Sequence, residues 1–273
     1  MRPEPVSPLL ERFRLAKRAE IAALEHKAEA GSLPDPLAGP RPAFRTRLVA
    51  SGGLPAVIAE YKRASPSRGA IATDLNPEAV AVRYAEAGAA CISVLTEEVH
   101  FQGHLEHLGR AAGPGLPLLR KDFLFHPLQV AQTGATPASA LLLIVRLTPE
   151  VRLLRALREQ AEALGLEAVV EVFDAADLAL ARDAGATLIQ VNARDLETLD
   201  VDRSACLRLA EAQRPKGRGE TWIAASGMSE AAHLRQAADC GYDAALLGTA
   251  LMQSGRPGEA LRRLLRHSRE LPQ

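Results

Sequence analysis

Residues 56–69 read AVIAEYKRASPSRG, and this stretch decides which α/β fold the chain adopts. Its first part, residues 56–61, is mostly apolar at consecutive positions, as expected of a parallel strand that is covered on both faces. In an open, doubly wound sheet, the turn after the first strand usually carries the glycine-rich sequence G-x-G-x-x-G. Here the turn over residues 62–69 carries basic, serine and proline residues instead. The stretch therefore favours a closed barrel over the open sheet.

Seven further apolar runs follow, and each leads through a turn into a segment with the pattern of an amphipathic helix. Asn76-Pro77 shows how such a helix starts, with Asn as its N-cap and Pro in its first turn, and Gly88 shows how one ends. Eight strand-helix units in ~220 residues fit a closed (β/α)₈ barrel, the TIM-barrel fold. The seven runs are residues 90–95, 117–121, 140–145, 168–172, 187–191, 222–226 and 244–247.

The first 50 residues precede this repeating pattern. Residues 8–30 space their apolar positions as one amphipathic helix does, and Gly31 ends it. Four prolines between positions 34 and 42 then indicate a connector that runs over the surface. We therefore expect residues 1–50 to form an extra N-terminal helix and a connector that belong to the same domain as the barrel, which covers residues 51–273.

The composition excludes several classes of protein. Of the 273 residues, 47% are hydrophobic and 24% are charged, so the chain can bury a large core and is not a disordered one. Lys plus Arg and Asp plus Glu are both 33, so no net field attracts nucleic acid or an anionic membrane. Only 4% of the residues are aromatic, too few for stacking platforms along a single-stranded nucleic acid. A charged small-molecule substrate must be held by local groups.

The cysteines and the hydropathy of the sequence indicate the cellular compartment in which the protein functions. Cys91, Cys206 and Cys240 are odd in number, far apart and set in apolar sequence, as expected of small buried side chains in a reducing compartment. The sequence has no uninterrupted apolar run of about 18 residues, and its N-terminus lacks the apolar block of a signal peptide. We expect a cytoplasmic protein with no membrane-spanning segment.

Charged residues lie at the carboxyl ends of several predicted strands, which is where barrels carry their chemistry. Glu60 and Lys62 close the first run, Lys121 closes the third and Glu171 lies in the fifth. Because side chains alternate along a strand, Glu60 and Lys62 share one face, and if that face is the barrel interior, two carboxylates and two amines converge on one mouth. The alternative reading is that these are ordinary strand ends or structural ion pairs. Charges at the same end of several strands disfavour it, since charged groups are rarely buried unless paired or used.

Other polar and aromatic side chains follow the runs at the same end. The sixth run ends in Asn192 and Arg194, which can bind a substrate. Phe101 follows the second run and Phe123 follows the third. Both phenylalanines can line a pocket for an aromatic substrate, and packing under a loop explains them equally well.

The last two runs end in sequences typical of phosphate binding. Ser226-Gly227 follows the seventh run and Gly248-Thr249 follows the eighth, and helix-forming residues come after each. The loops after these two strands, with a short helix amino terminus, form the usual phosphate site of a barrel because free backbone N–H groups and the helix dipole favour an anion. Ser65 from the first loop can add a hydroxyl.

His100, His104 and His107 have the spacing H-x₃-H-x₂-H, which can place metal ligands on one face of a helix. No cysteine or carboxylate of matching spacing completes a ligand set except Glu98 and Glu106, and the segment lies near a polar helix start. We therefore expect solvated or helix-capping histidines and no metal site.

Six motifs, taken together and in order, resemble the signatures of indole-3-glycerol-phosphate synthase, a (β/α)₈ barrel of tryptophan biosynthesis. The resemblance spans roughly residues 8–265 and includes the extra N-terminal helix. Several motifs in the family's order are more specific than any one of them. The motifs are EYKRASPS (60–67), SVLTE (93–97), LRKDF (119–123), VEV (170–172), NARDL (192–196) and SGMS (226–229).

The resemblance implies closure of 1-(2-carboxyphenylamino)-1-deoxyribulose 5-phosphate to indole-3-glycerol phosphate, with loss of carbon dioxide and water and without a cofactor or metal. Lys121 matches the family's general acid in ring closure. Lys62 matches a lysine that contacts the anthranilate carboxylate and is proposed to act in dehydration. Glu171 and Glu60 match carboxylates assigned to proton transfer and to holding the sugar hydroxyls.

The resemblance also assigns the binding groups. Asn192 and Arg194 match substrate-binding positions. Four further residues match positions that contact the substrate's phosphate in the family: Ser65, Ser226, Gly227 and Gly248. Only this small molecule is expected as a partner, with no nucleic acid or membrane, and the chain is expected to be a monomer.

Elementary chemistry agrees with these roles. Attack of an aromatic carbon on a carbonyl develops negative charge on oxygen, and a nearby ammonium group can donate a proton and stabilise that charge. Dehydration then needs a base for a proton and an acid for the leaving hydroxyl. Two lysines and two glutamates supply these groups.

The sequence departs from the family pattern at three positions. Ala225 stands where the family normally has Glu, Ala193 where it usually has a second Asn, and Phe173 where it often has His. Ala225 matters most, because a missing electrostatic group of this kind can cost on the order of 10² to 10³ in rate. It motivates one alternative, a catalytically weakened barrel that binds a phosphorylated ligand or a partner. A second alternative, phosphoribosylanthranilate isomerase, usually needs a Cys and Asp pair at strand ends, which this chain does not supply.

Overall fold

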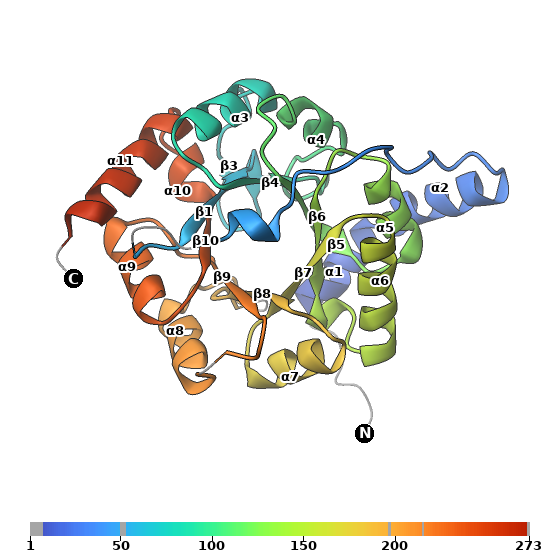
Figure 1. Ribbon diagram of the computed structural model, residues 1–273. Coiled ribbons are helices and arrows are strands. Elements are labelled where there is room, and N and C mark those ends of the chain that lie inside the picture. Colours follow the sequence, from blue (N-terminus) through green and yellow to red (C-terminus); the bar gives the residue numbers. More distant parts are fainter. Residues whose placement is uncertain (1–7, 50–52, 196–197, 215, 272–273) are drawn as a thin grey trace.

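The computed structural model describes residues 8–49, 53–195, 198–214 and 216–271. In these residues eight parallel strands close into a barrel in the order β1-β10-β9-β8-β7-β6-β5-β4, surrounded by helices (Figure 1). The (β/α)₈ TIM-barrel fold predicted from the sequence is confirmed. The strands are β1 (Ala56–Tyr61), β4 (Cys91–Leu95), β5 (Leu118–Leu124), β6 (Ala140–Ile144), β7 (Glu167–Val172), β8 (Leu188–Asn192), β9 (Thr221–Ala225) and β10 (Ala244–Leu247).

Each predicted apolar run forms one barrel strand, and β1 and β10 have the predicted limits. The largest difference is at β5. The pattern predicts an end at Lys121, whereas the strand continues to Leu124, with a register irregularity between Arg120 and Leu124. Leu124 is fully buried in the core between the barrel and its helices, which explains why the chain stays extended there. Lys121 therefore lies within the strand.

The helices follow the strands as predicted. At the start of α3 the Asn76 side chain accepts a hydrogen bond of 2.8 Å from the backbone N–H of Ala79, and Pro77 occupies the first turn. The loop after β1 adds a small hairpin of β2 (Ala64–Ser65) and β3 (Gly69–Ala70). The surrounding helices are α3 (Pro77–Glu86), α4 (Glu106–Ala111), α5 (Pro127–Gly134), α6 (Val151–Ala163), α7 (Ala175–Asp183), α8 (Arg203–Ala212), α9 (Ala231–Asp239), α10 (Thr249–Met252) and α11 (Pro257–Glu270).

Side-chain alternation along the strands divides the core into two layers. In β1, Val57, Ala59 and Tyr61 belong to the larger cluster between the barrel and the helices. Ile58 belongs to the smaller cluster inside the barrel, together with residues such as Leu119. The next residue of β1 on the inner face is Glu60. The alternation therefore carries the charged residue into the mouth of the barrel.

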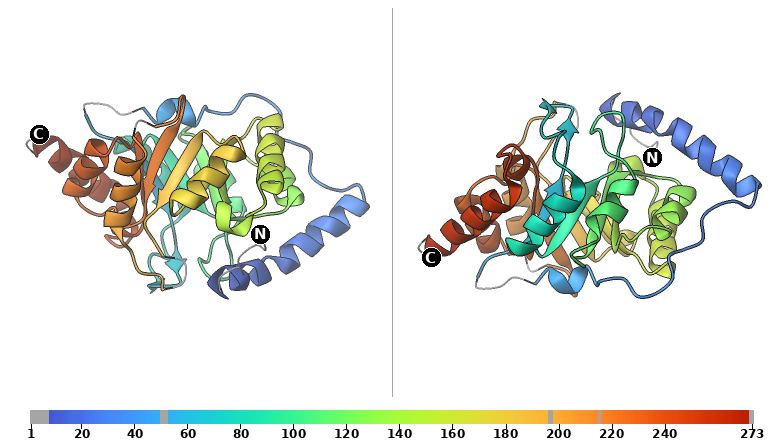
Figure 2. Two further views of the ribbon diagram at one scale, coloured as in Figure 1. Left: turned by 90° about the horizontal axis from the view of Figure 1, so that it is seen from below. Right: turned by 90° about the horizontal axis from the view of Figure 1, so that it is seen from above.

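The amino-terminal end of the barrel is closed by the 3₁₀ helix η1 (Arg45–Arg47). The backbone N–H groups of Phe44 and Arg45 donate to the Glu167 carboxylate at the start of β7, and the Phe44 side chain is fully buried in the inner cluster. Figure 2 shows η1 and the β2–β3 hairpin at opposite ends of the barrel. The mouth that carries the hairpin is thus the open end.

The N-terminal segment differs from its predicted form. The pattern predicts one helix over residues 8–30, but the structure has two, α1 (Pro8–Ala16) and α2 (Arg18–Glu29), interrupted at Lys17. The expectation of an uninterrupted helix is wrong at this residue. Lys17 is buried, and its amine reaches into the protein to the Asp122 carboxylate, a contact that the sequence alone does not reveal. Gly31, with φ of +63°, follows α2 as predicted.

Lys17 fastens α1 to β5 through a buried ionic network. Its Nζ lies 2.6 Å from Oδ1 of Asp122 and 2.7 Å from Oε2 of Glu20. Asp122 also accepts a hydrogen bond of 2.6 Å from the Thr96 hydroxyl and lies 3.3 Å from the Arg120 guanidinium. Burial alone would raise the pKa of the Asp122 carboxyl, but the cations of Lys17 and Arg120 outweigh it and the pKa is lowered.

This network and the apolar contacts of α1 tie the N-terminal segment to the barrel. Leu10 and Phe13 of α1 are buried in the inner cluster, and α1 lies at the end of the barrel that carries the β2–β3 hairpin (Figure 2). The packing supports the prediction that residues 1–50 belong to the same domain as the barrel, which stays a prediction. None of the helices in the described ranges has the length and apolarity needed to traverse a bilayer.

Replacing Lys17 by Met leaves the carboxylates of Asp122 and Glu20 with Arg120 as the one remaining cation of the network, so one negative charge is unbalanced. Breaking a buried ion pair typically costs about 3 to 5 kcal/mol because the remaining charge is uncompensated. We expect Lys17→Met to lower the free energy of unfolding by about that amount in urea titrations. Arg18→Met, which changes the exposed neighbouring residue, should stay within about 0.5 kcal/mol of the wild type. Equal stability of the two variants would contradict the network's role.

Candidate active site

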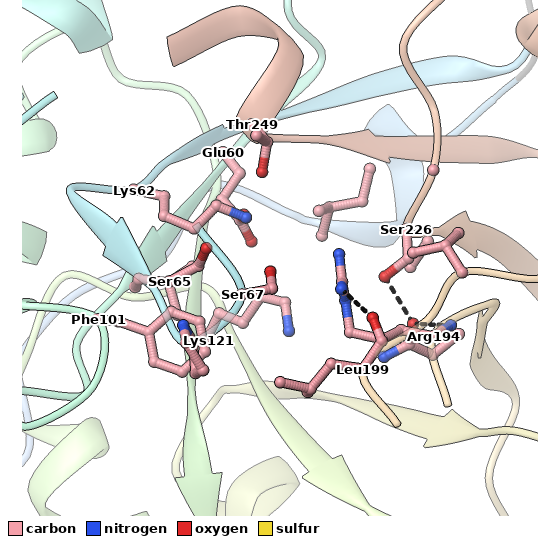
Figure 3. Close-up of a pocket in the computed structure, with 18 of the residues that line it drawn as sticks. Glu60, Lys62, Ser65, Ser67, Phe101, Lys121, Arg194, Leu199, Ser226 and Thr249 are labelled. Carbon is pink, nitrogen blue, oxygen red and sulfur yellow. Dashed lines mark hydrogen bonds and ion pairs between the residues drawn. The ribbon is translucent and has the colours of Figure 1, made fainter. Parts of the chain in front are cut away.

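A cavity of about 370 Å³ opens at the carboxyl ends of the strands, a volume suited to a small molecule (Figure 3). Phe13 of α1 and the polar loop residues Ser67 and Arg68 line it as well. Every site residue predicted from the sequence lines this one cavity, so the structure brings them together. They are Glu60, Lys62, Ser65, Phe101, Lys121, Phe123, Glu171, Asn192, Arg194, Ser226, Gly227, Gly248 and Thr249.

Glu60 and Lys62 form an ion pair at the end of β1. The Lys62 amine lies 2.8 Å from Oε1 of Glu60, and the Glu60 side chain is 2% exposed. The other carboxylate oxygen, Oε2, is buried and has no hydrogen-bond partner among the described residues. Burying a carboxylate oxygen without a hydrogen-bond partner costs free energy. This oxygen can therefore accept a hydrogen bond from a hydroxyl group of a bound ligand.

Lys121 and Glu171 face each other from β5 and β7. Their charged groups are 3.9 Å apart, close enough for electrostatic attraction and too far for a direct hydrogen bond. The Lys121 side chain remains 20% exposed toward the cavity, whereas that of Glu171 is 2% exposed. The amide of Gln190 donates a hydrogen bond to Glu171 from the adjacent strand β8. Sequence reasoning missed Gln190, because it lies inside an apolar run.

Arg194 and Ser226 lie across the cavity from Glu60 and Lys62 (Figure 3), and both form hydrogen bonds with Asn192. Oδ1 of Asn192 accepts hydrogen bonds from the Ser226 hydroxyl at 2.6 Å and from the Arg194 backbone N–H at 3.0 Å. The Asn192 amide therefore keeps its N–H donors for a ligand. The Arg194 guanidinium donates to the Leu199 carbonyl at 2.5 Å, and burial lowers its pKa from the usual value.

The loops after β9 and β10 have backbone conformations that suit close approach by an anion. Ser226 and Gly227 both have positive φ, of 68° and 72°, so the chain turns sharply beneath the cavity. Gly248 precedes α10, which has only four residues, so backbone N–H groups count for more here than a helix dipole. The hydroxyl of Ser65 is buried and has no partner in the described part of the chain. These groups together can hold a phosphate.

An aromatic wall closes another side of the cavity. The ring of Phe13 stacks on Phe123 with centroids 3.9 Å apart and an interplanar angle of 12°. Phe101 lies 6.1 Å from Phe123 at a tilted angle. Sequence reasoning missed Phe13, since it occupies an ordinary apolar position of an amphipathic helix and only packing shows what it covers. The wall can accommodate a flat apolar ring.

The three histidines do not share a helical face, and the expectation of solvated or helix-capping histidines is wrong for His107, which is buried. Only His107 belongs to α4, while His100 and His104 lie in the preceding loop. His100 contacts the Glu97 carboxylate at 3.1 Å, and burial together with nearby cations lowers the pKa of His107 to about 4. In the ranges that the structure describes, no group of three metal-ligating side chains comes together.

Ala225 occupies the inner face of β9 beside the mouth. It pairs in register with Asn192 on β8 and with Leu246 on β10, and it is buried. Its methyl group therefore lies where a longer side chain would enter the cavity. Phe173 stacks under the guanidinium of Arg146 at 4.6 Å, outside the cavity lining.

Comparison with known proteins assigns the family. The sequence model of one family, Indole-3-glycerol phosphate synthase, matches residues 10–264. The chain belongs to the indole-3-glycerol phosphate synthase family. The resemblance seen in the sequence motifs is thereby confirmed.

Relatives that carry the family name in full are similar over most of the chain. The indole-3-glycerol phosphate synthase of Desulfotalea psychrophila is 38% identical over 266 residues, which cover 96% of this chain and 100% of that protein. The one from Mycobacterium tuberculosis is 40% identical, over 90% of this chain and 87% of its own length. That from Salinibacter ruber is 44% identical, over 76% of each.

Solved structures at lower identity share the barrel fold alone. A 3-hexulose-6-phosphate synthase superposes with a TM-score of 0.60 at 15% identity, covering 79% of this chain and 98% of the other. A mandelate oxidase variant also gives 0.60 at 17% identity, covering 87% and 80%. These values describe a common architecture, so the family assignment rests on sequence.

Gly248 leaves no room for a side chain in this member of the indole-3-glycerol phosphate synthase family. A Cβ at position 248 would overlap Oε1 of Glu60, so Gly248→Ala must move the carboxylate away from Lys62. Misplacement of a reacting group by about 1 Å can cost about 10²-fold in rate, and we expect a loss of kcat/KM of that order. The assay is steady-state turnover of the family's carboxyphenylamino-deoxyribulose phosphate.

Gly109→Ala is the matched control, because a Cβ at that helix position meets no atom within 4 Å. It should retain wild-type kcat/KM. A fully active Gly248→Ala enzyme would show that the placement of Glu60 is not critical.

Proposed function

We propose that this cavity carries out the reaction of the indole-3-glycerol phosphate synthase family, the closure of 1-(2-carboxyphenylamino)-1-deoxyribulose 5-phosphate to indole-3-glycerol phosphate with loss of carbon dioxide and water. The chain is a decarboxylating lyase of tryptophan biosynthesis by its family. The observation that carries the proposal for this site is the meeting of two amines and two carboxylates, Lys62, Lys121, Glu60 and Glu171, around one cavity. The reaction needs acids and bases of these two kinds.

The binding groups divide the substrate into three parts. The phosphate would lie at the loops after β9 and β10, held by Ser226, Gly227, Gly248 and Thr249 with the Ser65 hydroxyl. The anthranilate ring would lie against Phe101 and Phe123, with its carboxylate toward Lys62. Asn192 and Arg194 would hold the ribulose part of the substrate, which links the phosphate to the ring. This arrangement is supported by the separation of anion-holding loops from the aromatic wall within one cavity.

Lys121 would act as the general acid in ring closure. As the aromatic carbon attacks the ribulose carbonyl, negative charge develops on the carbonyl oxygen, and the Lys121 ammonium donates a proton to it. Carbon dioxide then leaves from the same aromatic carbon and restores the ring. The partial exposure of Lys121 to the cavity supports this role, because its amine can reach a bound molecule.

Dehydration would use the remaining groups. The new hydroxyl leaves with a proton from an ammonium group, for which Lys62 is placed beside Glu60. Glu171 would take the proton from the ring, and Glu60 would hold the sugar hydroxyls through its unpartnered oxygen. Each group would thus have one task in the sequence of steps.

The alternative readings have less support. The comparisons do not favour a catalytically weakened barrel, since named synthases match over most of the chain. An isomerase that uses a Cys and Asp pair is disfavoured, because Cys91, Cys206 and Cys240 are buried and none lines the cavity.

A cytoplasmic monomer is also part of the proposal. The described cysteines are unpaired, and burial raises the pKa of the Cys91 thiol to about 12, as suits structural thiols in a reducing compartment. Few large apolar side chains in the described ranges are exposed, among them Leu15, Val82 and Val201. Large contiguous patches of exposed apolar side chains often mark an interface between copies.

Lys121→Ala tests the proposed acid. General acid catalysis contributes about 10² to 10⁴ in rate, so we expect kcat to fall by that factor, followed by the fluorescence of the indole product. The control is Lys27→Ala on the exposed face of α2, which should leave kcat unchanged. Wild-type protein without turnover would refute the proposed function, and full activity of the Lys121 variant would refute the role of this residue.

Ala225→Glu tests whether the cavity lacks a useful carboxylate. We expect kcat to rise by about 10- to 100-fold, since a placed charge of this kind is worth up to about 10² to 10³ in rate. Ala225→Gln has the same shape without the charge and should give no such rise. An unchanged or lower kcat in a folded Ala225→Glu protein would mean that another group compensates for the missing carboxylate.

A further inference from the structure

Gln190 is a polar side chain inside an otherwise apolar strand. It lies on β8 two residues before Asn192 and is fully buried, with 0% exposure. Its neighbours along the strand, Ile189 and Val191, belong to the outer core, so alternation directs Gln190 to the barrel interior. No family motif described above includes it. On the inner face of β8, Gln190 is therefore the residue before Asn192, which is hydrogen-bonded to Ser226 at the cavity.

The amide of Gln190 contacts a carboxylate that the proposed mechanism uses. Its Nε2 donates a hydrogen bond to Oε2 of Glu171, and the two residues are paired in register between β7 and β8. The opposite orientation of the amide would place its oxygen against a carboxylate oxygen, which is repulsive. In the part of the chain that the structure describes, Gln190 is the hydrogen-bond donor to Glu171, because Lys121 remains 3.9 Å away.

Burial of this amide is costly for the protein. Its oxygen, Oε1, has no hydrogen-bond partner in the described ranges. An apolar side chain of similar size would avoid the desolvation of that oxygen, as the neighbouring interior residues Leu188 and Ile223 do. Fold stability alone therefore does not account for a glutamine here, whereas the bond to Glu171 does.

We propose that Gln190 is a positioning residue that holds the Glu171 carboxylate in line with Lys121 and the substrate. The inference rests on the proposed function. Without the amide, a carboxylate with no other described donor can turn away from the cavity. On the other side, Gln190 pairs in register with Ile223 of β9, two positions before Ala225 on the same inner face.

Gln190→Met keeps the length of the side chain and removes the donor. We expect kcat to fall by about 10- to 100-fold, the effect of losing one hydrogen bond to a charged group, with KM little changed because the amide does not bind the substrate. The matched control is Leu188→Met, a volume-conserving change on the inner face of the same strand, which should leave both constants unchanged. A melting curve establishes that each variant is folded.

A double-mutant cycle separates positioning from a general packing effect. In a Glu171→Gln background, Gln190→Met should cause no further loss, because the carboxylate that it positions is absent. The same loss in both backgrounds would overturn the proposal, and so would unchanged kcat in folded Gln190→Met. Wild-type protein without turnover would instead overturn the proposed function, and this inference with it.

Gln190→Glu provides a second test, which remains informative if Gln190→Met does not fold. Two adjacent carboxylates cannot both ionise easily, and while they share a proton the protonated one can donate the hydrogen bond that the amide provides. Lys121 on β5 lies 3.9 Å from Glu171, and the apolar Ile144 on β6 and Ile223 on β9 pair in register with Glu171 and Gln190. We expect kcat of Gln190→Glu to fall with rising pH over a range where wild-type kcat is level. Parallel pH profiles would overturn the proposal.

Discussion

The hydrogen-bond register of a closed parallel sheet is the constraint on which this site depends. Eight strands that pair side by side must all end at the same mouth, and alternation sends every second side chain inward. Glu60, Lys121 and Glu171 come from three strands that are far apart in the chain. The closed sheet brings their side chains to one cavity, so the charges are in place before any ligand arrives.

Buried charged groups need oppositely charged or hydrogen-bonding partners. In this protein, one of these partners comes from the N-terminal segment, which precedes the repeating strand-helix units. Lys17, at the break between α1 and α2, neutralises Asp122 in the same strand that carries Lys121. Phe13, one turn earlier, stacks on Phe123 in the cavity wall. The N-terminal segment is thus a structural part of the mouth. A segment that would look like an appendage in sequence contributes to the stability of the site, because its buried contacts hold the two residues of β5 that directly follow the proposed acid.

Much of this arrangement was predictable from the sequence, and the exceptions have a physical cause in common. The apolar runs predicted all eight barrel strands, and the strand-end positions predicted the residues that line the cavity, because the period of a strand is short and local. Lys17, Phe13 and Gln190 were not predicted. Each occupies a position where the local pattern predicts only an amphipathic helix or an apolar strand, and each acquires its role from a residue more than 15 positions away. Periodicity carries no information about such partners.

The sequence by itself determined the fold class, the family and the kinds of chemistry available, since these follow from local hydrophobic pattern and from motifs in a fixed order. Tertiary structure decided the rest. It set which oxygen of Glu60 is paired and which is free, where β5 ends, how the helix breaks at Lys17, and what Gln190 touches. These features depend on distances between side chains from different strands, and such distances exist only once the barrel has closed and burial has made every polar contact costly to leave unmade.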